Sequence, residues 1–432
     1  MPPRTRTGPP EPATGSALLP RSFGACAFAF ASLVGLASPG LIRDAKAAPA
    51  AAQDSRKPCG IAATASPAEQ VRACTQYLRS ALTAPEKAAA LNARGYAYAQ
   101  QQQAEKAMAD FNAALEADPN CAPALINRGN LFDDAGKSDA ALADFSKAIA
   151  ASPQSALAYF NRGLALQRAG DAKKALADFS EAIKRDPQQA ASYVRRGIAY
   201  SALGQHNQAI ADFSKAMALG GHSAAVYINR GNARDRKGER RAAITDYNAA
   251  LRIDAKSAAA YYNRGLAQRH REEFDLALAD LTQALKLDPQ NALVLSARGE
   301  VYADKGDQAR ALADFTAALK ADPDAGPIYN NRGSIYLARK DYKHAADDFA
   351  KASVLMPGKS LPLFNYATAL YAAGQAKGAL PIIDKAIATD AKPAMALKLR
   401  SQIYASLGEH GKAQSDLKRA VALDPALGKT AK

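Results

Sequence analysis

The 432-residue sequence contains no tryptophan, few other aromatic residues and few cysteines. Aromatic residues make up only 7% of the chain, so any core must be built from small aliphatic side chains. Four cysteines are too few for a disulfide-stapled scaffold, and a hydrophobic content of 48% is too high for a disordered chain. Acidic residues are outnumbered as well, with 41 against 56 lysines and arginines. The net charge of +15 favours acidic partners or surfaces.

The most regular feature of the sequence is a 34-residue unit that recurs without insertion or deletion. Ten consecutive units cover residues 88–427, the first beginning at Ala88. Position 8 is glycine in eight of them, namely Gly95, Gly129, Gly163, Gly197, Gly231, Gly265, Gly299 and Gly333. Positions 20 and 27 are alanine in all ten units, and position 24 is mostly phenylalanine. A repeat of this length indicates one array of small units rather than several separate domains.

Each unit is predicted to fold as two helices, which the third unit illustrates. Its two apolar stripes with helical spacing are Tyr159, Gly163 and Leu166, and then Ala175, Phe179 and Ala182. Gly170-Asp171 marks the turn between the helices, and Asp186-Pro187 ends the second one. Gly163 and Ala175 carry almost no side chain, so we expect the two helices to approach closely, with Phe179 filling the remaining space.

This pattern of glycine, alanine, phenylalanine and proline resembles the tetratricopeptide repeat. The residues that carry the resemblance in the third unit are Gly163, Ala175, Phe179, Ala182 and Pro187, and it extends in phase over residues 88–427. The resemblance implies an all-α, right-handed superhelical solenoid of helix-turn-helix repeats, with a concave groove lined by the first helices. It also implies a scaffold for protein–protein interactions. The periodicity by itself indicates only stacked helix pairs.

Both ends of the array depart from the regular unit. Residues 48–87 are predicted to form an N-terminal cap with a partial repeat, in which Ala73, Tyr77 and Pro85 predict a second helix from Pro67 to Leu82. In the last two units Ala367 and Ser401 replace the glycine, and only a short tail, 428–432, follows the array. No solvating helix caps this end, so it either frays or packs on a partner or on a second copy of the chain.

The N-terminal 47 residues resemble a secretory signal peptide. A basic, proline-rich stretch precedes an uncharged apolar run from Phe23 to Ala37, and Ala45-Lys46-Ala47 offers a cleavage site. The run is short for a stable membrane span, and we expect a periplasmic or secreted protein. A retained anchor and a disordered cytoplasmic tail are the alternatives.

Export would allow Cys59 and Cys74 to form a disulfide, which closes a loop of about 15 residues. The alternative is two buried thiols that act as small apolar residues. Cys121 would have no partner in either case.

An arginine at position 7 and an aspartate at position 23 each occur in nine of the ten units. The ninth unit lacks both and has Tyr366 and Ile382 in their places. Because the two residues are lost together, we predict that each arginine pairs with the aspartate of its own unit and bridges its two helices. The alternative is a row of free arginines that binds phosphates or carboxylates.

Position 6 is asparagine in six units and forms the predicted peptide-binding row. Its members are Asn127, Asn161, Asn229, Asn263, Asn331 and Asn365. An asparagine side chain offers an acceptor and two donors, so it can bond both polar groups of a peptide unit. The row resembles the asparagine ladder of O-GlcNAc transferase, although here it is interrupted. The alternative is that each asparagine bonds a neighbouring helix.

Position 5 is apolar in units two to six and forms a second predicted row. Its members are Ile126, Phe160, Val194, Ile228 and Tyr262. In the tetratricopeptide repeat family this position commonly faces the groove, where such side chains would form pockets for a ligand. The alternative is that they belong to the core.

Motifs of common catalytic and cofactor sites are absent from the sequence. Gly428-Lys429-Thr430 is no phosphate-binding loop, because Leu423 stands where its first glycine is needed. None of the five histidines pairs with a nearby cysteine or glutamate in metal-ligand spacing, and there is no Gly-x-Ser-x-Gly motif. We therefore expect no enzyme activity, small-molecule substrate, cofactor or metal. The predicted function is capture of a peptide segment of a partner protein. The alternative is binding of a polyanion, either nucleic acid, which is less favoured, or an acidic envelope polymer.

Overall fold

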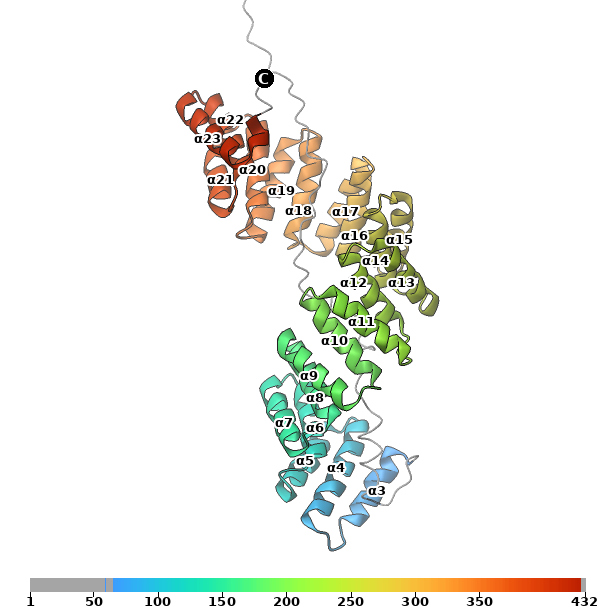
Figure 1. Cartoon of the computed structure of the whole chain (residues 1–432). Coiled ribbons are helices and arrows are strands. Elements are labelled where there is room, and N and C mark those ends of the chain that lie inside the picture. The colour runs from blue at the N-terminus through green and yellow to red at the C-terminus, as the bar shows by residue number, and fades with distance from the viewer. Residues whose placement is uncertain (1–58, 60–64, 429–432) are drawn as a thin grey trace, which may run out of the picture. The chain divides into compact units, whose positions relative to one another are not determined.

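The computed structural model describes Cys59 and residues 65–428, in which all regular structure is helical (Figure 1). The predicted signal peptide, residues 1–47, lies outside the described residues. So do residues 48–58 and 60–64 of the predicted N-terminal cap. None of the helices in the described part is long and apolar enough to cross a membrane.

Each 34-residue unit contributes one first helix and one second helix. The first helices are α4 (Ala84–Gln100), α6 (Ala122–Asp134), α8 (Ala156–Arg168), α10 (Ala190–Ala202), α12 (Ala224–Arg236), α14 (Ala258–Arg269), α16 (Ala292–Asp304), α18 (Gly326–Ala338), α20 (Ser360–Ala372) and α22 (Ala394–Ser406). The second helices are α5 (Ala104–Ala117), α7 (Ser138–Ala151), α9 (Ala172–Arg185), α11 (His206–Ala218), α13 (Arg240–Ile253), α15 (Phe274–Leu287), α17 (Gln308–Ala321), α19 (Tyr342–Leu355), α21 (Ala376–Thr389) and α23 (His410–Leu423). A short α3 (Pro67–Tyr77) precedes them and a 3₁₀ turn, η3 (Pro425–Gly428), follows.

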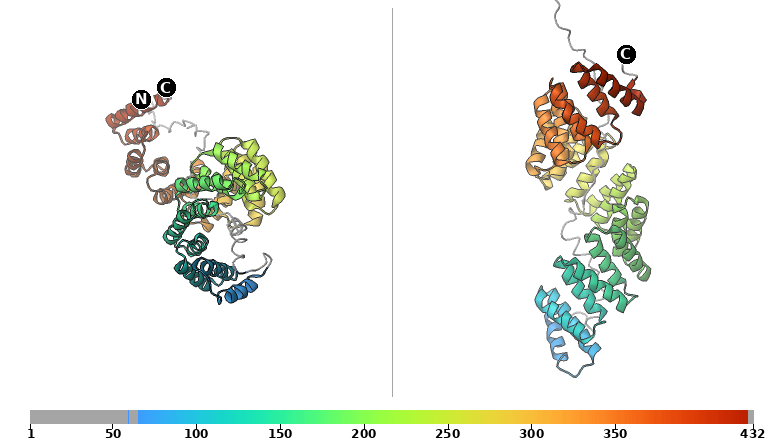
Figure 2. Two further views of the ribbon diagram at one scale, coloured as in Figure 1. Left: turned by 60° about the horizontal axis from the view of Figure 1, so that its bottom comes forward. Right: turned by 90° about the vertical axis from the view of Figure 1, so that its left-hand side faces the viewer.

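The chain is an all-α solenoid in which every helix packs on its neighbours in sequence. The two helices of a unit contact each other, each second helix contacts the next unit's first helix, and successive first helices also touch. Figures 1 and 2 show this local order from three directions. The first helices therefore form one continuous row along the array.

The small residues set the distance between the two helices of a unit, as the sequence predicted. A Cβ placed on Gly163 would lie 2.7 Å from Cε1 of Phe179, closer than carbon atoms can approach. The Phe179 ring is fully buried, as are Ala175 and Ala182 on the same helix. In the ninth unit the larger Ala367 replaces glycine, and the smaller Ile383 occupies the place of the ring. Glycine and the aromatic ring therefore fit each other by volume.

The turn between the two helices depends on a left-handed residue at position 15 of the unit. Gly170 has this conformation in the third unit, with φ of 83°. The next residue, Asp171, accepts a hydrogen bond from the main-chain N–H of Lys174 and so caps α9. The same conformation is taken without glycine by Gln102, Glu272 and Lys340, at a cost of about 1 kcal/mol each.

The N-terminal partial unit differs from its prediction in register. The expected helix from Pro67 to Leu82 ends at Tyr77, because α4 begins at Ala84 and draws Pro85 into its own first turn. The phase of the repeat places Tyr77 at position 24, which holds a buried aromatic residue in most regular units. In the structure the fully buried residue of α3 is instead Cys74. The partial unit is therefore shifted by three residues relative to the regular array. In the structure Cys74 is joined to Cys59 by a disulfide.

The last unit presents apolar side chains to solvent. Met395 on α22 is 52% exposed, and Leu423 at the end of α23 is 51% exposed. The serine that replaces glycine in this unit, Ser401, donates a hydrogen bond to the carbonyl of Ala413 (2.7 Å) and so still allows close packing. Oligomerisation through the C-terminal units remains a prediction.

Candidate functional site

The arginines at position 7 bind the aspartates of their own units, which confirms the within-unit pairing. In all nine pairs Nε and Nη2 donate to the two carboxylate oxygens, at 2.6–3.1 Å. The aspartates are buried. In Arg196, for example, the hydrogen bonds with Asp212 raise the pKa of the guanidinium above its ordinary value. These nine arginines are part of the framework and are not available to a ligand.

Each of these arginines also has a third partner, which the sequence reasoning missed. Its Nη1 donates to the side chain at position 25 of the preceding unit, over 2.5–3.4 Å in units two to eight and ten. The acceptors are Asn112, Ser146, Ser180, Ser214, Asn248, Thr282, Thr316 and Asp384. The signal was present in the sequence, because Ala350 stands at position 25 before the ninth unit, whose arginine is missing. The arginine therefore joins adjacent units as well as the two helices of one unit.

Four members of the asparagine row are engaged within the protein. Nδ2 of Asn127 donates to Oδ1 of Asn92 (2.8 Å), and Nδ2 of Asn365 donates to Oδ1 of Asn330 (2.8 Å). Nδ2 of Asn331 donates to Oε1 of Glu300 (3.1 Å), and Nδ2 of Asn263 donates to the carbonyl of Ala259 (2.9 Å). For Asn127, Asn331 and Asn365 the alternative that the asparagine bonds a neighbouring helix describes the structure, whereas Asn263 bonds within its own helix.

Asn161 and Asn229 differ, because their side chains make no hydrogen bond within residues 65–428. The reason lies at position 5 of the preceding unit, which supplies the acceptor for Asn127 and for Asn365. Before Asn161 this position holds Ile126, and before Asn229 it holds Val194, so neither offers an acceptor. Position 6 of the unit between them is Arg195. Among the described residues, units three to five thus carry the polar groups of this row that have no partner.

The apolar row at position 5 is largely core, which corrects part of the predicted ligand surface. Phe160 is fully buried, and Ile126 and Tyr262 are 5% and 7% exposed. All three belong to clusters of buried residues between adjacent units. Val194 and Ile228 are half-buried and remain accessible. The three buried side chains cannot form pockets for a ligand, because the next unit already packs on them.

Charged side chains farther along the first helices link neighbouring units, a role the sequence reasoning did not assign. Arg168 on α8 is paired with Asp133 on α6. Nε of Arg269 on α14 lies 2.6 Å from a carboxylate oxygen of Asp304 on α16, and the same guanidinium is paired with Glu300. Burial raises the pKa of Glu300, although the charge of Arg269 acts in the opposite direction. These pairs occupy the first-helix row on either side of units four and five.

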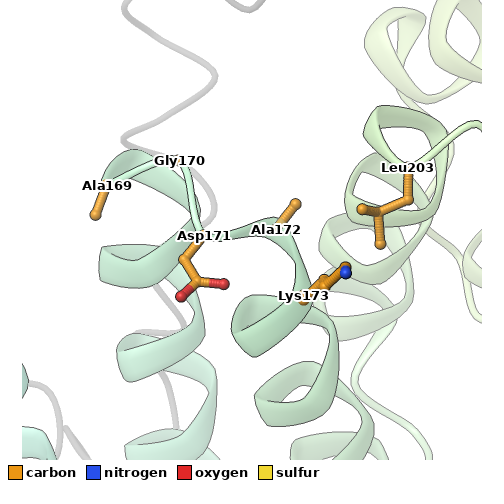
Figure 3. A pocket seen from close by; sticks show the side chains of 6 residues that line it. All are labelled: Ala169, Gly170, Asp171, Ala172, Lys173 and Leu203. Atoms are coloured by element: carbon orange, nitrogen blue, oxygen red, sulfur yellow. The ribbon is translucent and has the colours of Figure 1, made fainter.

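A shallow pocket lies away from the first-helix row, at the turns of units three and four (Figure 3). It is lined by Ala169, Gly170, Asp171, Ala172, Lys173 and Leu203. Its carboxylate, that of Asp171, already caps α9 and lies 2.9 Å from the ammonium of Lys174. In Figure 3 the labelled side chains do not converge on a common point. The described residues also contain no group of three histidines, cysteines or acids placed to hold a metal ion.

Family models of the tetratricopeptide repeat match most of the array. The matched residues are 88–121, 126–190, 161–224, 236–270, 258–291, 296–358 and 399–427. Together these segments cover more than half of the chain. A comparison with curated proteins finds no match.

Solved structures of several helical-repeat proteins resemble the chain. One is YrrB, described as a TPR protein with an unusual peptide-binding site, at 22% identity and a TM-score of 0.37, over 46% of this chain and 97% of YrrB. Another is Pseudomonas aeruginosa PilF, at 20% identity and a TM-score of 0.45, over 50% of this chain and 99% of PilF. Yeast Tom70 matches at 16% identity and a TM-score of 0.45, over 82% of this chain and 88% of Tom70.

Proposed function

Because the chain belongs to the tetratricopeptide repeat family, and is thus a protein–protein interaction scaffold, we propose that it binds an extended peptide segment along its row of first helices. In this proposal its function is non-enzymatic. The observation that supports it best is the pair of side-chain amides at Asn161, which is 5% exposed, and Asn229, which is half-buried, because neither has a hydrogen-bond partner among residues 65–428. An extended chain has unsatisfied N–H and C=O groups, and a carboxamide can bond both.

The binding segment is centred on units three to five. Elsewhere in the row the asparagines already bond inside the protein, and a ligand would have to break those bonds. The half-buried Val194 and Ile228 stand beside the unpartnered groups and provide apolar contact area. Little side-chain preference is expected from the asparagines, because they bond the main chain.

A test of this function compares two double variants of the full-length chain. The probe is an immobilised array of random 12-residue peptides with acetylated N-termini and amidated C-termini. Asn161→Ala with Asn229→Ala should reduce binding of the captured peptides at least about tenfold, since two bonds to the ligand are lost, and leave the melting temperature unchanged. The matched control is Asn127→Ala with Asn365→Ala, which should bind normally but melt at a lower temperature.

Three outcomes would contradict the proposal: no peptide is captured, the two double variants lose binding equally, or Asn161→Ala with Asn229→Ala melts as low as the control. Binding of a polyanion is the alternative, and salt separates the two. Contacts to several phosphates weaken steeply between 50 and 200 mM salt, whereas bonds from neutral amides do not. The nine paired arginines are balanced by nine buried aspartates, so a polyanion would meet the net charge of +15 through other basic groups.

We also propose that the protein acts outside the cytoplasm, in the periplasm or after secretion. The Cys59–Cys74 disulfide supports this location, because such bonds persist in oxidising compartments. The signal-like order of residues 1–47 supports it as well. The non-reduced intact mass of the protein from its own host tests both points. A chain that starts at Ala48 and lacks two hydrogens is expected, and a full-length reduced mass would contradict the proposal.

A further inference from the structure

Arg195 is a half-buried positive charge that has no partner among residues 65–428. It makes no hydrogen bond and no ion pair there, unlike the nine paired arginines of position 7. Burial lowers the pKa of its guanidinium, and the nearby charge of Arg168 lowers it further. A charge removed from water without a counter-charge is costly, so a group of this kind usually has a partner.

The neighbouring first helices supply no anion to Arg195. On α8 the equivalent positions 5 and 9 are Phe160 and Leu164, and both are buried and apolar. Asp133 on α6 is already paired with Arg168, and the carboxylate of Asp235 on α12 lies 3.9 Å from Nε of Arg240 and 3.8 Å from Nδ1 of His270. On α12 position 9 is Asn232, whose Oδ1 accepts a hydrogen bond from the Tyr247 hydroxyl (2.8 Å). The counter-charge must therefore come from outside the array.

We propose that Arg195 binds the side-chain carboxylate of an aspartate or glutamate within an extended peptide, whose main chain is held by Asn161 and Asn229 on either side. This inference rests on the proposed function, and it adds a sequence requirement to it. A guanidinium presents two parallel N–H groups that match the two oxygens of a carboxylate. Burial of the site strengthens such a bond relative to one in water.

The position of Arg195 in the row favours a side chain over a chain terminus. The unpartnered groups occupy three consecutive units, and Arg195 lies in the middle one. A peptide that bonds the amides of both outer units continues on both sides of the arginine. Its carboxylate must then be a side chain, because a C-terminal carboxylate would leave one outer asparagine without a ligand.

The same geometry favours a peptide over a nucleic acid. A phosphate polymer would need several free cationic groups at regular spacing. Here Arg168 is paired with Asp133, Arg234 on α12 is paired with Asp246, and the adjacent Arg196 is bound to Asp212. The guanidinium of Arg195, which has no partner among residues 65–428 and a neutral amide in the unit on either side, matches a single acidic residue in a polar main chain.

The test applies the peptide array to the full-length chain and to its Arg195→Gln variant. Peptides captured by the unchanged chain should be enriched in aspartate and glutamate, and the enrichment should disappear with Arg195→Gln. The strongest acidic peptide should bind Arg195→Gln at least about tenfold more weakly in solution. Replacing its acidic residue by the corresponding amide should weaken binding to the original chain equally. It should cause no further loss in the variant, because the two changes remove one interaction.

Two control variants separate recognition from structure. Arg195→Lys keeps the charge and should retain part of the affinity, and Arg196→Gln should instead destabilise the fold. A free-acid version of each peptide is tested beside the amidated one, and a 20-nucleotide single strand serves as a phosphate probe. Only the amidated acidic peptide, bound in an Arg195-dependent way, supports the inference.

The outcomes are distinguishable from failure of the proposed function. If peptides are captured without acidic enrichment, or if Arg195→Gln captures the same set, this inference fails and the proposed function stands. If no peptide is captured, the proposed function itself fails. A requirement for the free C-terminus overturns the side-chain assignment, and Arg195-dependent binding of the oligonucleotide alone assigns the group to phosphate.

Discussion

Arg195 and Arg196 are neighbours on α10, and their surroundings differ in almost every respect. Arg196 donates from Nε and Nη2 to the buried carboxylate of Asp212, at 2.7 and 2.8 Å. Its Nη1 reaches Ser180 of the preceding unit (3.4 Å). Arg195 has no partner in the described part of the chain. The pKa of Arg196 is raised above its ordinary value, and that of Arg195 is lowered.

This contrast separates the framework of the array from its free surface. The hydrogen-bonding groups of Arg196 are satisfied inside the protein, so its contribution is to folding and to the register between units. Those of Arg195, Asn161 and Asn229 are not satisfied by residues 65–428, and we propose that a ligand satisfies them. Net charge alone does not reveal this difference, because both arginines carry the same charge.

The largest expected effect is from Arg196→Gln. The change leaves the carboxylate of Asp212, which is 5% exposed, without its cationic partner. Breaking a buried pair from one side typically costs about 3–5 kcal/mol, and this pair should lie near the lower limit because Arg196 is half-buried. Hydrogen exchange in α10 and α11 measures the local free energy of opening. A loss no larger than that of Arg195→Gln would remove the distinction between the two arginines.

A somewhat smaller loss is expected from Gly197→Ala on the same helix. The new Cβ would lie 2.9 Å from Cε1 of Phe213 and force the two helices of the unit apart. Overpacking of this kind costs about 1–3 kcal/mol. Combining it with Phe213→Leu should cost less than the sum of the two single changes, as in unit nine, where Ala367 is combined with the smaller Ile383. Strict additivity, measured by urea unfolding, would contradict this packing account.

The asparagine row gives the next comparison, between Asn127 and Asn229. Asn127→Ala removes the hydrogen bond to the buried Asn92 and should cost about 1 kcal/mol. Asn229→Ala removes no internal bond and should change stability by less than about 0.5 kcal/mol. Thermal unfolding of the two single variants measures the difference. Equal losses would show that Asn229 is structural.

The smallest effect on stability is expected from Arg195→Gln. The variant replaces an unpaired, partly desolvated charge by a neutral polar group, so its melting temperature should equal that of the original chain or exceed it slightly. Thermal unfolding at low salt, where repulsion from Arg168 is least screened, gives the clearest reading. A drop as large as that caused by Arg196→Gln would mean that Arg195 stabilises the fold.

Most of the framework could be predicted from the sequence, because it depends on residues that recur in phase. Gly163 and Phe179 match by volume, and the joint replacement of arginine and aspartate in the ninth unit revealed their pairing. The third partner of the arginine could also have been predicted. Position 25 of the eighth unit is the apolar Ala350, and the unit that follows is the one that lacks the arginine. The three-residue shift of the partial unit could not be predicted. It depends on α4, which begins at Ala84, before the first residue of the first unit.

The candidate site could be predicted only in outline. The sequence identified the asparagine row, but whether an asparagine is free depends on the side chain that the preceding helix places beside it. Asn92 and Asn330 provide acceptors for two members of the row, whereas Ile126 and Val194 do not. Burial of Phe160 similarly depends on how the next unit packs, which a single position cannot show. The importance of Arg195 became apparent only when the partners of its neighbours were known.

The most direct test of the central claim is hydrogen–deuterium exchange of the full-length chain, with and without the strongest peptide from the array. We predict slower exchange concentrated in α8, α10 and α12, with little change in α18, α20 and α22. Protection confined to the second helices, or centred on the last units, would contradict the assignment of the ligand to the first helices of units three to five.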